Sequence, residues 1–338
     1  MKPRLPLLSF EVTMDCNLKC RFCYNHCKNT GVKPEISSYT IAKKTLKKIF
    51  KVFDVGQLTF TGGEPFMSER FSELVLLARL KGATVTVISN GNFAQIDKYL
   101  QLTELGVKLF ELPIHSHNPE IHDLMTGRKG SHEKSVSIIK NLIVNAVTPV
   151  AVIVLTKFNA DSILETVKFI SNLGIKQVML NRYNIGGEGV KKPLEVLPTE
   201  SQLKKAFSEI SLFALKNNLK VFSSVCTPFC ILKPTEYPGI GFSSCSTDIT
   251  KRPVTIDYLG NLRFCNHSPV VLGNIFKNSP QEILSNPLLK EWENVVPNFC
   301  ANCEKFKYCK AGCRAASQQC GFALDKPDPI IFMYNKKQ

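Results

Sequence analysis

Apolar and polar positions along the first two thirds of the chain alternate between two periods. Short apolar runs typical of strands are followed by segments with apolar residues three or four positions apart, which is typical of amphipathic helices. The expected strands are residues 7–14, 57–61, 84–88, 107–114, 150–155 and 177–180. The expected helices are residues 40–53, 72–80, 96–105, 135–146, 163–173 and 201–217. Six strand–helix units in series predict an α/β fold, a partial (β/α)6 TIM-like barrel with its chemistry at the C-terminal strand ends.

This alternation ends near residue 220. The remaining segment has few long periodic runs, many turn-forming Pro and Gly residues, and nine of the thirteen cysteines. Such a segment is typical of a small domain stabilised by bound metal. We therefore expect a barrel domain at residues 1–220 and a Cys-rich, metal-binding domain at residues 221–338.

Composition narrows the class of protein. Hydrophobic residues make up 44% and charged residues 21%, which is ordinary globular composition. The longest apolar run, residues 150–155, is far shorter than the roughly 20 residues that span a bilayer. The first ten residues lack the apolar core of a signal peptide. We expect a cytoplasmic protein without a membrane partner, in which thirteen cysteines favour metal binding over disulfides.

The net charge of +15 is compatible with an acidic peptide or a nucleic acid as partner. Lysine dominates this excess and is scattered along the sequence. The pattern therefore favours a solvated Lys-rich surface that also compensates anionic thiolates, and a nucleic acid is not the expected partner.

Three cysteines, Cys16, Cys20 and Cys23, directly follow the first expected strand, where a barrel carries an active-site loop. Iron–sulfur clusters normally take four cysteine ligands, so three thiolates leave one iron open to an external chelator. The alternative is zinc, which prefers paired Cys-x2-Cys elements and four ligands.

The pattern Cys-x3-Cys-x-aromatic-Cys, with Phe22 in the aromatic position, resembles the signature of the radical S-adenosylmethionine (SAM) superfamily. Gly62-Gly63-Glu64-Pro65, after the second strand, resembles the GGEP motif of this family, which binds the amino group of the cosubstrate. Two glycines permit close backbone approach, and a carboxylate suits an ammonium group.

Two further strand ends resemble family positions near the cosubstrate. Ser89 and Asn90 end the third strand, where similar proteins place ribose-contacting groups. Asn181 and Arg182 end the sixth strand, and the alternative for this pair is a surface turn. The resemblance implies reductive cleavage of SAM to a 5′-deoxyadenosyl radical that abstracts a substrate hydrogen. It also implies a flavodoxin or ferredoxin as reductant.

The C-terminal cysteines resemble the SPASM domain that some radical SAM enzymes carry. The matching string is Cys245-x14-Gly260-x4-Cys265 followed by Cys300-x2-Cys303-x5-Cys309-x3-Cys313 and Cys320. Residues 257–264 are expected to form a hairpin that positions Cys265. The resemblance implies a first auxiliary cluster on Cys245, Cys265 and Cys313, and a second on Cys300, Cys303, Cys309 and Cys320.

The first auxiliary cluster is then one ligand short. Cys230 or Cys226, in Cys-Thr-Pro-Phe-Cys, can supply it, and we assign Cys230. The alternatives for the leftover thiol are a hydrogen donor to a substrate radical and an inert core residue. Cys27 has no place in the pattern and reads as a spectator. We thus expect three [4Fe–4S] clusters on about eleven cysteines.

Histidines follow the fourth strand in Ile-His-Ser-His. His115 and His117 are expected to face the barrel mouth, where they shape the pocket or act as acid and base. The alternative is a pair of hydrogen-bonded loop histidines. His122 and His132 are expected at the surface.

Double-cluster relatives with this appendage often modify peptides by crosslinking, thioether formation, oxidation or epimerisation, so a peptide is the leading substrate hypothesis. The alternative is a dehydrogenase, epimerase or decarboxylase of a sugar, aminocyclitol or tetrapyrrole. A non-catalytic iron–sulfur electron carrier is the third hypothesis, against which Glu64 and the open three-cysteine site argue. Because the first strand begins near residue 7, we expect leader binding to need the barrel itself or a separate protein.

Overall fold

The short apolar runs form one sheet of eleven strands in the computed structural model, which describes residues 2–27, 38–246, 248 and 252–335. The order across the sheet is β11-β10-β9-β1-β2-β3-β4-β5-β6-β7-β8, and β11 and β8 are its two ends. The strands are β1 (Arg4–Thr13), β2 (Asp54–Gly62), β3 (Thr84–Ile88), β4 (Leu109–Pro113), β5 (Val150–Leu155), β6 (Gln177–Arg182), β7 (Lys220–Ser223), β8 (Ile240–Phe242), β9 (Val254–Asp257), β10 (Asn261–Arg263) and β11 (Val271–Asn274).

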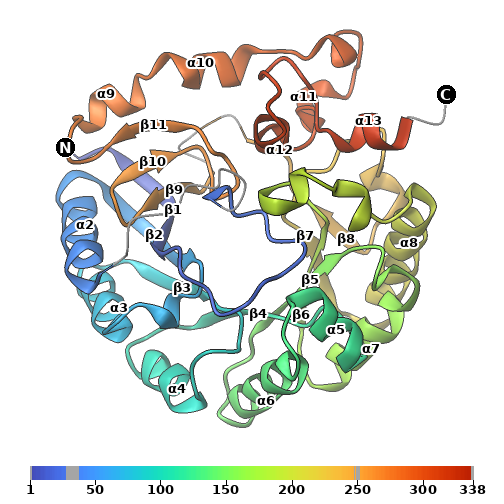
Figure 1. Ribbon diagram of the computed structural model, residues 1–338, viewed down its shortest axis with the longest axis horizontal. Coiled ribbons are helices and arrows are strands. Elements are labelled where there is room, and N and C mark those ends of the chain that lie inside the picture. Colours follow the sequence, from blue (N-terminus) through green and yellow to red (C-terminus); the bar gives the residue numbers. More distant parts are fainter. Residues whose placement is uncertain (1, 28–37, 247, 249–251, 336–338) are drawn as a thin grey trace.

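Strands β1 to β8 pair in parallel with their neighbours, as expected for strand–helix units. Figure 1 shows the strands bent into an open ring with helices outside, so the predicted partial barrel is confirmed. The helices of the ring are α2 (Tyr39–Val52), α3 (Phe71–Leu80), α4 (Ile96–Glu104), α5 (Pro119–Thr126), α6 (Ser131–Val144), α7 (Ile163–Asn172) and α8 (Glu200–Asn217). The C-terminal helices are α9 (Pro280–Leu284), α10 (Pro287–Asn294), α11 (Phe306–Cys309), α12 (Arg314–Gln319) and α13 (Ile330–Asn335).

Strand β1 illustrates why the barrel has a polar interior. Leu8, Phe10 and Val12 belong to the hydrophobic core, and the Phe10 ring lies 6.0 Å from that of Phe60 on β2. Because side chains alternate along a strand, Glu11 points to the opposite side, away from the helices. The helices therefore cover an apolar face, while charged and hydroxyl groups remain inside the ring.

The sheet continues past residue 220, where the periodic pattern ends. Strands β7 and β8 extend the parallel ring, and β9 pairs in parallel with β1. The expected hairpin is present as antiparallel β9 and β10, joined by a turn in which Gly260 has φ of 87°. One sheet thus contains strands from both sides of the expected boundary, and the division into two domains stays a prediction.

Two buried ion pairs join the barrel to the C-terminal segment. Glu11 on β1 pairs with Arg263 on β10, and Arg182 at the end of β6 pairs with Asp328 before α13. Both arginines and Asp328 are at most 1% exposed. Removing one member of either pair would leave a buried charge unpaired, so these contacts fix the C-terminal segment on the barrel.

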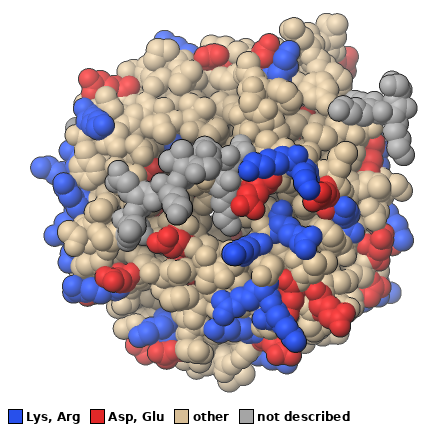
Figure 2. All heavy atoms as spheres, in the orientation of Figure 1, with Lys and Arg blue, Asp and Glu red and all other residues tan. Residues whose placement is uncertain are grey.

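Charges on the face seen in Figure 1 are distributed unevenly. Lysine and arginine side chains lie across the lower half of this face with aspartate and glutamate among them, while the part over the C-terminal segment is largely uncharged (Figure 2). The interspersed signs agree with the expected solvated Lys-rich surface. Among the helices in the described ranges, none combines the length and the apolar character needed to cross a membrane.

Candidate active site and cysteine clusters

The loop after β1 crosses the opening of the ring (Figure 1) and carries Cys16, Cys20 and Cys23, all partly buried. Its backbone is docked on the end of α5: the Lys19 amide donates to the Thr126 carbonyl (3.1 Å) and the Arg21 amide to the Met125 carbonyl (2.9 Å). A side chain at Gly127 would lie 2.6 Å from the Lys19 carbonyl oxygen, so this close approach requires glycine. Helix α5 therefore holds the three-cysteine loop in place.

Gly62 and Gly63 bring the ends of β1 and β2 together. The Gly63 amide donates to the Thr13 carbonyl and the Glu64 amide to the Asp15 carbonyl, each at 2.7 Å. A Cβ atom would lie 2.1 Å from the Thr13 carbonyl oxygen at Gly62 and 2.0 Å from the Asp15 carbonyl oxygen at Gly63. The close approach that the two glycines permit here is between two backbones, and it sets the start of the cysteine loop.

The Glu64 carboxylate is buried and organises the neighbouring strand ends. Its Oε1 accepts hydrogen bonds from the Ser89 hydroxyl (2.8 Å) and the Phe66 amide (3.3 Å), and its Oε2 accepts one from the Asn90 amide (2.7 Å). Pro65 follows as the first residue of a short 3₁₀ helix. Burial raises the pKa of Glu64 to about 7, although these hydrogen bonds oppose the shift.

Ser89 and Asn90 connect this carboxylate to the cysteine loop. The Asn90 side-chain amide donates to Asn17 Oδ1 (2.9 Å) and lies 3.6 Å from the Cys16 sulfur, while Ser89 also contacts the Tyr99 hydroxyl (2.8 Å). The ends of β1, β2 and β3 thus form one hydrogen-bonded unit around the first cysteine.

Asn181 and Arg182 both contact the segment that leads to Cys226. Asn181 Oδ1 accepts hydrogen bonds from the Ser224 and Val225 amides, at 2.9 and 3.2 Å. Arg182 donates to the Cys226 carbonyl (2.9 Å) and pairs with Asp328, which also accepts hydrogen bonds from the Cys313 amide (2.8 Å) and the Ile330 amide (3.1 Å). The surface-turn alternative is wrong for Arg182, which is 1% exposed. The guanidinium instead positions two cysteine-bearing loops, and its contact with the cosubstrate stays a prediction.

The histidines after β4 are largely internal. His115 is 3% exposed, its Nδ1 accepts the Val154 amide (3.2 Å), and its ring packs against Phe22 of the cysteine loop at 4.5 Å. Burial holds the pKa of His115 well below its usual range. His117 is half-buried and contacts Thr166 through its amide and its ring. The contacts of both residues match the alternative of hydrogen-bonded loop histidines.

The expected surface position of His122 and His132 is wrong. They are 0% and 7% exposed, and the rings of His115, His122 and His132 follow one another at 5.3 and 5.4 Å. Burial lowers the pKa of His122 to about 3. Helices α5 and α6 pack against each other, which turns these polar-looking positions inward.

Sequence reasoning missed Glu111, in the middle of β4. Phe110 and Leu112 are fully buried in the core, so Glu111 faces the ring interior by alternation. Burial raises the pKa of Glu111 to about 7. Its charge, with those of Glu11, Cys23 and Cys265, adds to the effect of burial in raising the pKa of Tyr24. A charged residue inside an otherwise apolar strand was the signal that could have identified it.

Eight of the nine C-terminal cysteines lie in two groups. Cys226 and Cys245 share a hydrogen bond, which raises the pKa of Cys226 and lowers that of Cys245, and the charges of Cys313 and Cys265 also act on Cys226. The second group lines a separate cavity and consists of Cys230, Cys300, Cys303 and Cys309. Cys320 does not line that cavity.

The cysteines of the chain are present as thiols in the structure. None of the thirteen cysteines, all of which lie in described residues, is in a disulfide. Within the described ranges, no three Cys, His, Asp or Glu side chains are close enough together to hold one metal ion. A cubane differs from a single ion in that it separates its ligands by the width of the cluster.

Comparisons with known proteins agree with this arrangement. The radical SAM superfamily model matches residues 10–170, and the SPASM iron–sulfur cluster-binding domain model matches residues 245–313. The chain belongs to the radical SAM superfamily and carries a SPASM domain.

Three relatives illustrate its place in this superfamily. The antilisterial bacteriocin subtilosin biosynthesis protein AlbA of Bacillus subtilis (strain 168) is 29% identical over 318 residues, covering 90% of this chain and 66% of AlbA. The mycofactocin maturase MftC of Mycolicibacterium smegmatis (strain ATCC 700084 / mc(2)155) is 26% identical, covering 95% and 81%. The GTP 3′,8-cyclase of Aquifex aeolicus (strain VF5) is 25% identical, covering 67% and 76%.

A solved structure shares the fold over nearly the whole chain. Native anSMEcpe with bound AdoMet and Cp18Cys peptide superposes with a TM-score of 0.74 at 19% identity, covering 98% of this chain and 95% of that one. The fold similarity therefore includes both the barrel and the C-terminal segment.

Proposed function

We propose that this radical SAM enzyme modifies a peptide, by crosslinking, thioether formation, oxidation or epimerisation of a ribosomally made precursor. The observation that carries the proposal is the three-cysteine loop, joined to Glu64 and Asn90 at the ring opening and accompanied by two further cysteine groups. The names of AlbA, a bacteriocin biosynthesis protein, and of MftC, a maturase, support a peptide substrate. The similarity to the GTP 3′,8-cyclase supports the alternative, a small-molecule substrate.

Three [4Fe–4S] clusters and SAM are the proposed cofactors. Cys16, Cys20 and Cys23 would hold the cluster that leaves one iron for SAM, and the two C-terminal groups would hold auxiliary clusters. When bound, the first cluster and SAM supply a 5′-deoxyadenosyl radical that abstracts hydrogen from the substrate. The protein's part is to orient SAM and the peptide and to exclude water.

The proposed SAM-binding residues are those joined around the first cysteine, namely Gly62, Gly63, Glu64, Pro65, Ser89 and Asn90. Both carboxylate oxygens of Glu64 already accept hydrogen bonds from the protein. Its role is therefore to shape the turn at the ends of β1 to β3 and to place a negative charge near the methionine ammonium. The Phe22 ring, packed on His115, fixes the loop from the other side.

Inside the ring, Glu111 is the group best suited to meet the substrate. A carboxyl group with a pKa near 7 can exchange a proton at neutral pH, which suits acid–base catalysis. His117, at the rim, is a second candidate, whereas the neutral His115 supports the loop. The external partners we propose are a flavodoxin or ferredoxin as reductant and, for the peptide, a separate leader-binding protein.

The test is an anaerobic reaction of the reduced protein with SAM and synthetic peptides encoded by short reading frames beside its gene. We expect 5′-deoxyadenosine and a change in peptide mass, with deuterium moving from a labelled peptide into 5′-deoxyadenosine. Cleavage of SAM without any peptide change, combined with neighbouring genes for sugar or cofactor synthesis, would support the small-molecule alternative.

A further inference from the structure

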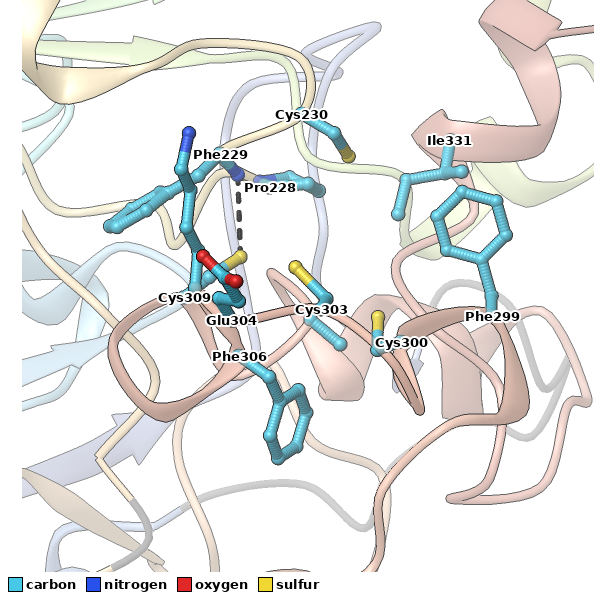
Figure 3. Close-up of a pocket in the computed structure, with 12 residues that line it drawn as sticks. Pro228, Phe229, Cys230, Phe299, Cys300, Cys303, Glu304, Phe306, Cys309 and Ile331 are labelled. Carbon is cyan, nitrogen blue, oxygen red and sulfur yellow. Dashed lines mark hydrogen bonds between the residues drawn. The ribbon is translucent and has the colours of Figure 1, made fainter.

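A cavity of about 360 Å³ lies between the segment after β7 and the segment that contains α11. Four of its lining residues are Cys230, Cys300, Cys303 and Cys309. Figure 3 shows their sulfur atoms directed toward a common space, with Cys230 approaching from the side opposite the other three. Four thiols around one cavity are the ligand number that a cubane requires.

Electrostatic contacts support this grouping. Cys309 and Cys303 lie close enough to Cys230 to act on it electrostatically. Cys300 is likewise within electrostatic reach of Cys309, Cys303 and Cys230. Each thiol thus lies within reach of the charges of the others, an arrangement that bound iron would neutralise.

The segment containing Cys230 is docked against the Cys309-x3-Cys313 turn by a specific packing contact. Gly312 has φ of 76°, and a Cβ there would lie 2.6 Å from Pro228 and 2.9 Å from the Cβ of Asp328. The missing side chain lets the Pro228 ring pack directly against the backbone of Gly312. The Ile231 and Leu232 amides then donate to the Pro228 carbonyl and form a turn that presents Cys230 to the cavity.

The residue before Cys230 adds a contact that iron–sulfur proteins use. The Phe229 amide donates a hydrogen bond to the Cys309 sulfur at 3.3 Å (Figure 3). Such bonds to ligand sulfurs influence the reduction potential of a cluster. The same short segment therefore supplies both a thiol and an N–H group to this cavity.

Cys320 lies elsewhere. It caps the C-terminal end of α12, whose N-terminal cap is Cys313, and the rise over the seven steps from one cap to the other is about 10 Å. Burial raises the pKa of Cys320 to about 11, and its charged neighbour is Asp328 rather than another cysteine. The rigid helix thus carries Cys320 away from Cys313 without bringing it to the cavity.

We propose that Cys230, Cys300, Cys303 and Cys309 hold the second auxiliary cluster of this protein and that Cys226 completes the first, with Cys245, Cys265 and Cys313. Cys320 is then not a ligand. Compared with the expected sets, Cys226 replaces Cys230 in the first cluster and Cys230 replaces Cys320 in the second. The assignment rests on the proposed count of three clusters.

The direct test compares Cys230→Ala with Cys320→Ala in the full chain, after anaerobic cluster reconstitution. The parent should contain about twelve irons with matching sulfide. Cys320→Ala should keep this content and the electron paramagnetic resonance spectrum of the reduced parent. Cys230→Ala should lose iron toward about eight or show one cluster with an altered spectrum. The reverse pattern would overturn the assignment.

A second measurement needs no variant, in case Cys230→Ala does not fold. Cys230 is exposed in the protein chain, so iodoacetamide should modify it once a chelator and an oxidant have removed the clusters and a reductant has restored the thiols. In the cluster-loaded parent, Cys230 should be protected, whereas modification of Cys320 should be equal before and after cluster removal. Modification of Cys230 in a parent with about twelve irons would overturn the assignment.

The failure of the assignment is distinguishable from that of the proposed cofactors. A parent with about eight irons would overturn the count of three clusters and the second cluster with it. Zinc in place of iron in the C-terminal segment would do the same. Formation of 5′-deoxyadenosine, which depends on Cys16, Cys20 and Cys23, is measured separately in the parent.

Discussion

The two cysteine-bearing regions are built in opposite ways. The loop after β1 takes its three cysteines from eight consecutive residues and is fixed by neighbouring backbone contacts with α5 and the end of β2. The C-terminal groups collect thiols from segments up to 87 residues apart, between Cys226 and Cys313, and depend on buried ion pairs. A short local motif therefore reveals an open site, whereas spacing alone does not tell which thiols the fold brings together from distant segments.

The largest expected effect separates the two regions. Replacing Cys16, Cys20 and Cys23 by alanine should abolish 5′-deoxyadenosine formation and remove about four irons, leaving about eight in the C-terminal groups. Iron analysis and product chromatography measure both changes, with Cys27→Ala as control at parent levels. Loss of nearly all iron would show that the two regions do not assemble independently, and undiminished activity would refute the radical SAM assignment of the loop.

In the C-terminal region, Asp328→Ala should leave Arg182 as an unpaired buried charge. We expect a loss of about 3–5 kcal/mol in unfolding free energy, together with lower iron content, because Asp328 also holds the Cys313 amide. Anaerobic thermal and urea unfolding measure the loss. The matched control is Glu195→Ala, which breaks the exposed Lys192 pair and should cost about 0–1 kcal/mol. Equal losses in the two variants would show that the buried pair has no special role.

The barrel site should be more sensitive to backbone contact than to charge. Gly63→Ala would place Cβ 2.0 Å from the Asp15 carbonyl oxygen, so the ends of β1 and β2 must separate. We expect a destabilisation of about 1–3 kcal/mol and weaker SAM binding. Gly241→Ala on β8 is the control, since its nearest neighbour would be an ordinary 3.7 Å contact. Calorimetry should find SAM affinity unchanged in the control, and unchanged affinity in Gly63→Ala would contradict the proposed role.

The smallest effect concerns the ring interior. Because burial raises the pKa of Glu111 from 4.5 to about 7, the folded state holds its proton more tightly than the unfolded state. The unfolding free energy should therefore fall as pH rises from about 4.5 to 7 and level off above that range. Glu111→Gln should remove this part of the slope, whereas Glu104→Gln on the exposed side of α4 should keep it. Parallel slopes in all three proteins would place Glu111 in a more solvated environment.

The sequence predicted what is local and periodic. Strands β3 and β5 have the expected bounds because their apolar runs are short and clearly delimited. His122 was misjudged because its burial depends on how α5 packs against α6, which the sequence pattern does not specify. The contact between Arg182 and Asp328 spans 146 residues, and no pattern of spacing encodes it. Likewise, Cys226 and Cys230 are separated into different groups only by the fold around Pro228 and Gly312.

The pairing of β1 with β9 has a consequence for synthesis. Phe10 on β1 aligns with Ile256 on β9, 246 residues later. At roughly 5–20 residues per second, this edge of β1 stays unpaired on the ribosome for roughly 12–50 s. An unpaired apolar strand edge is a template for aggregation. The nascent barrel therefore exposes this edge until β9 has been made, and a fragment ending at residue 220 would keep it open permanently.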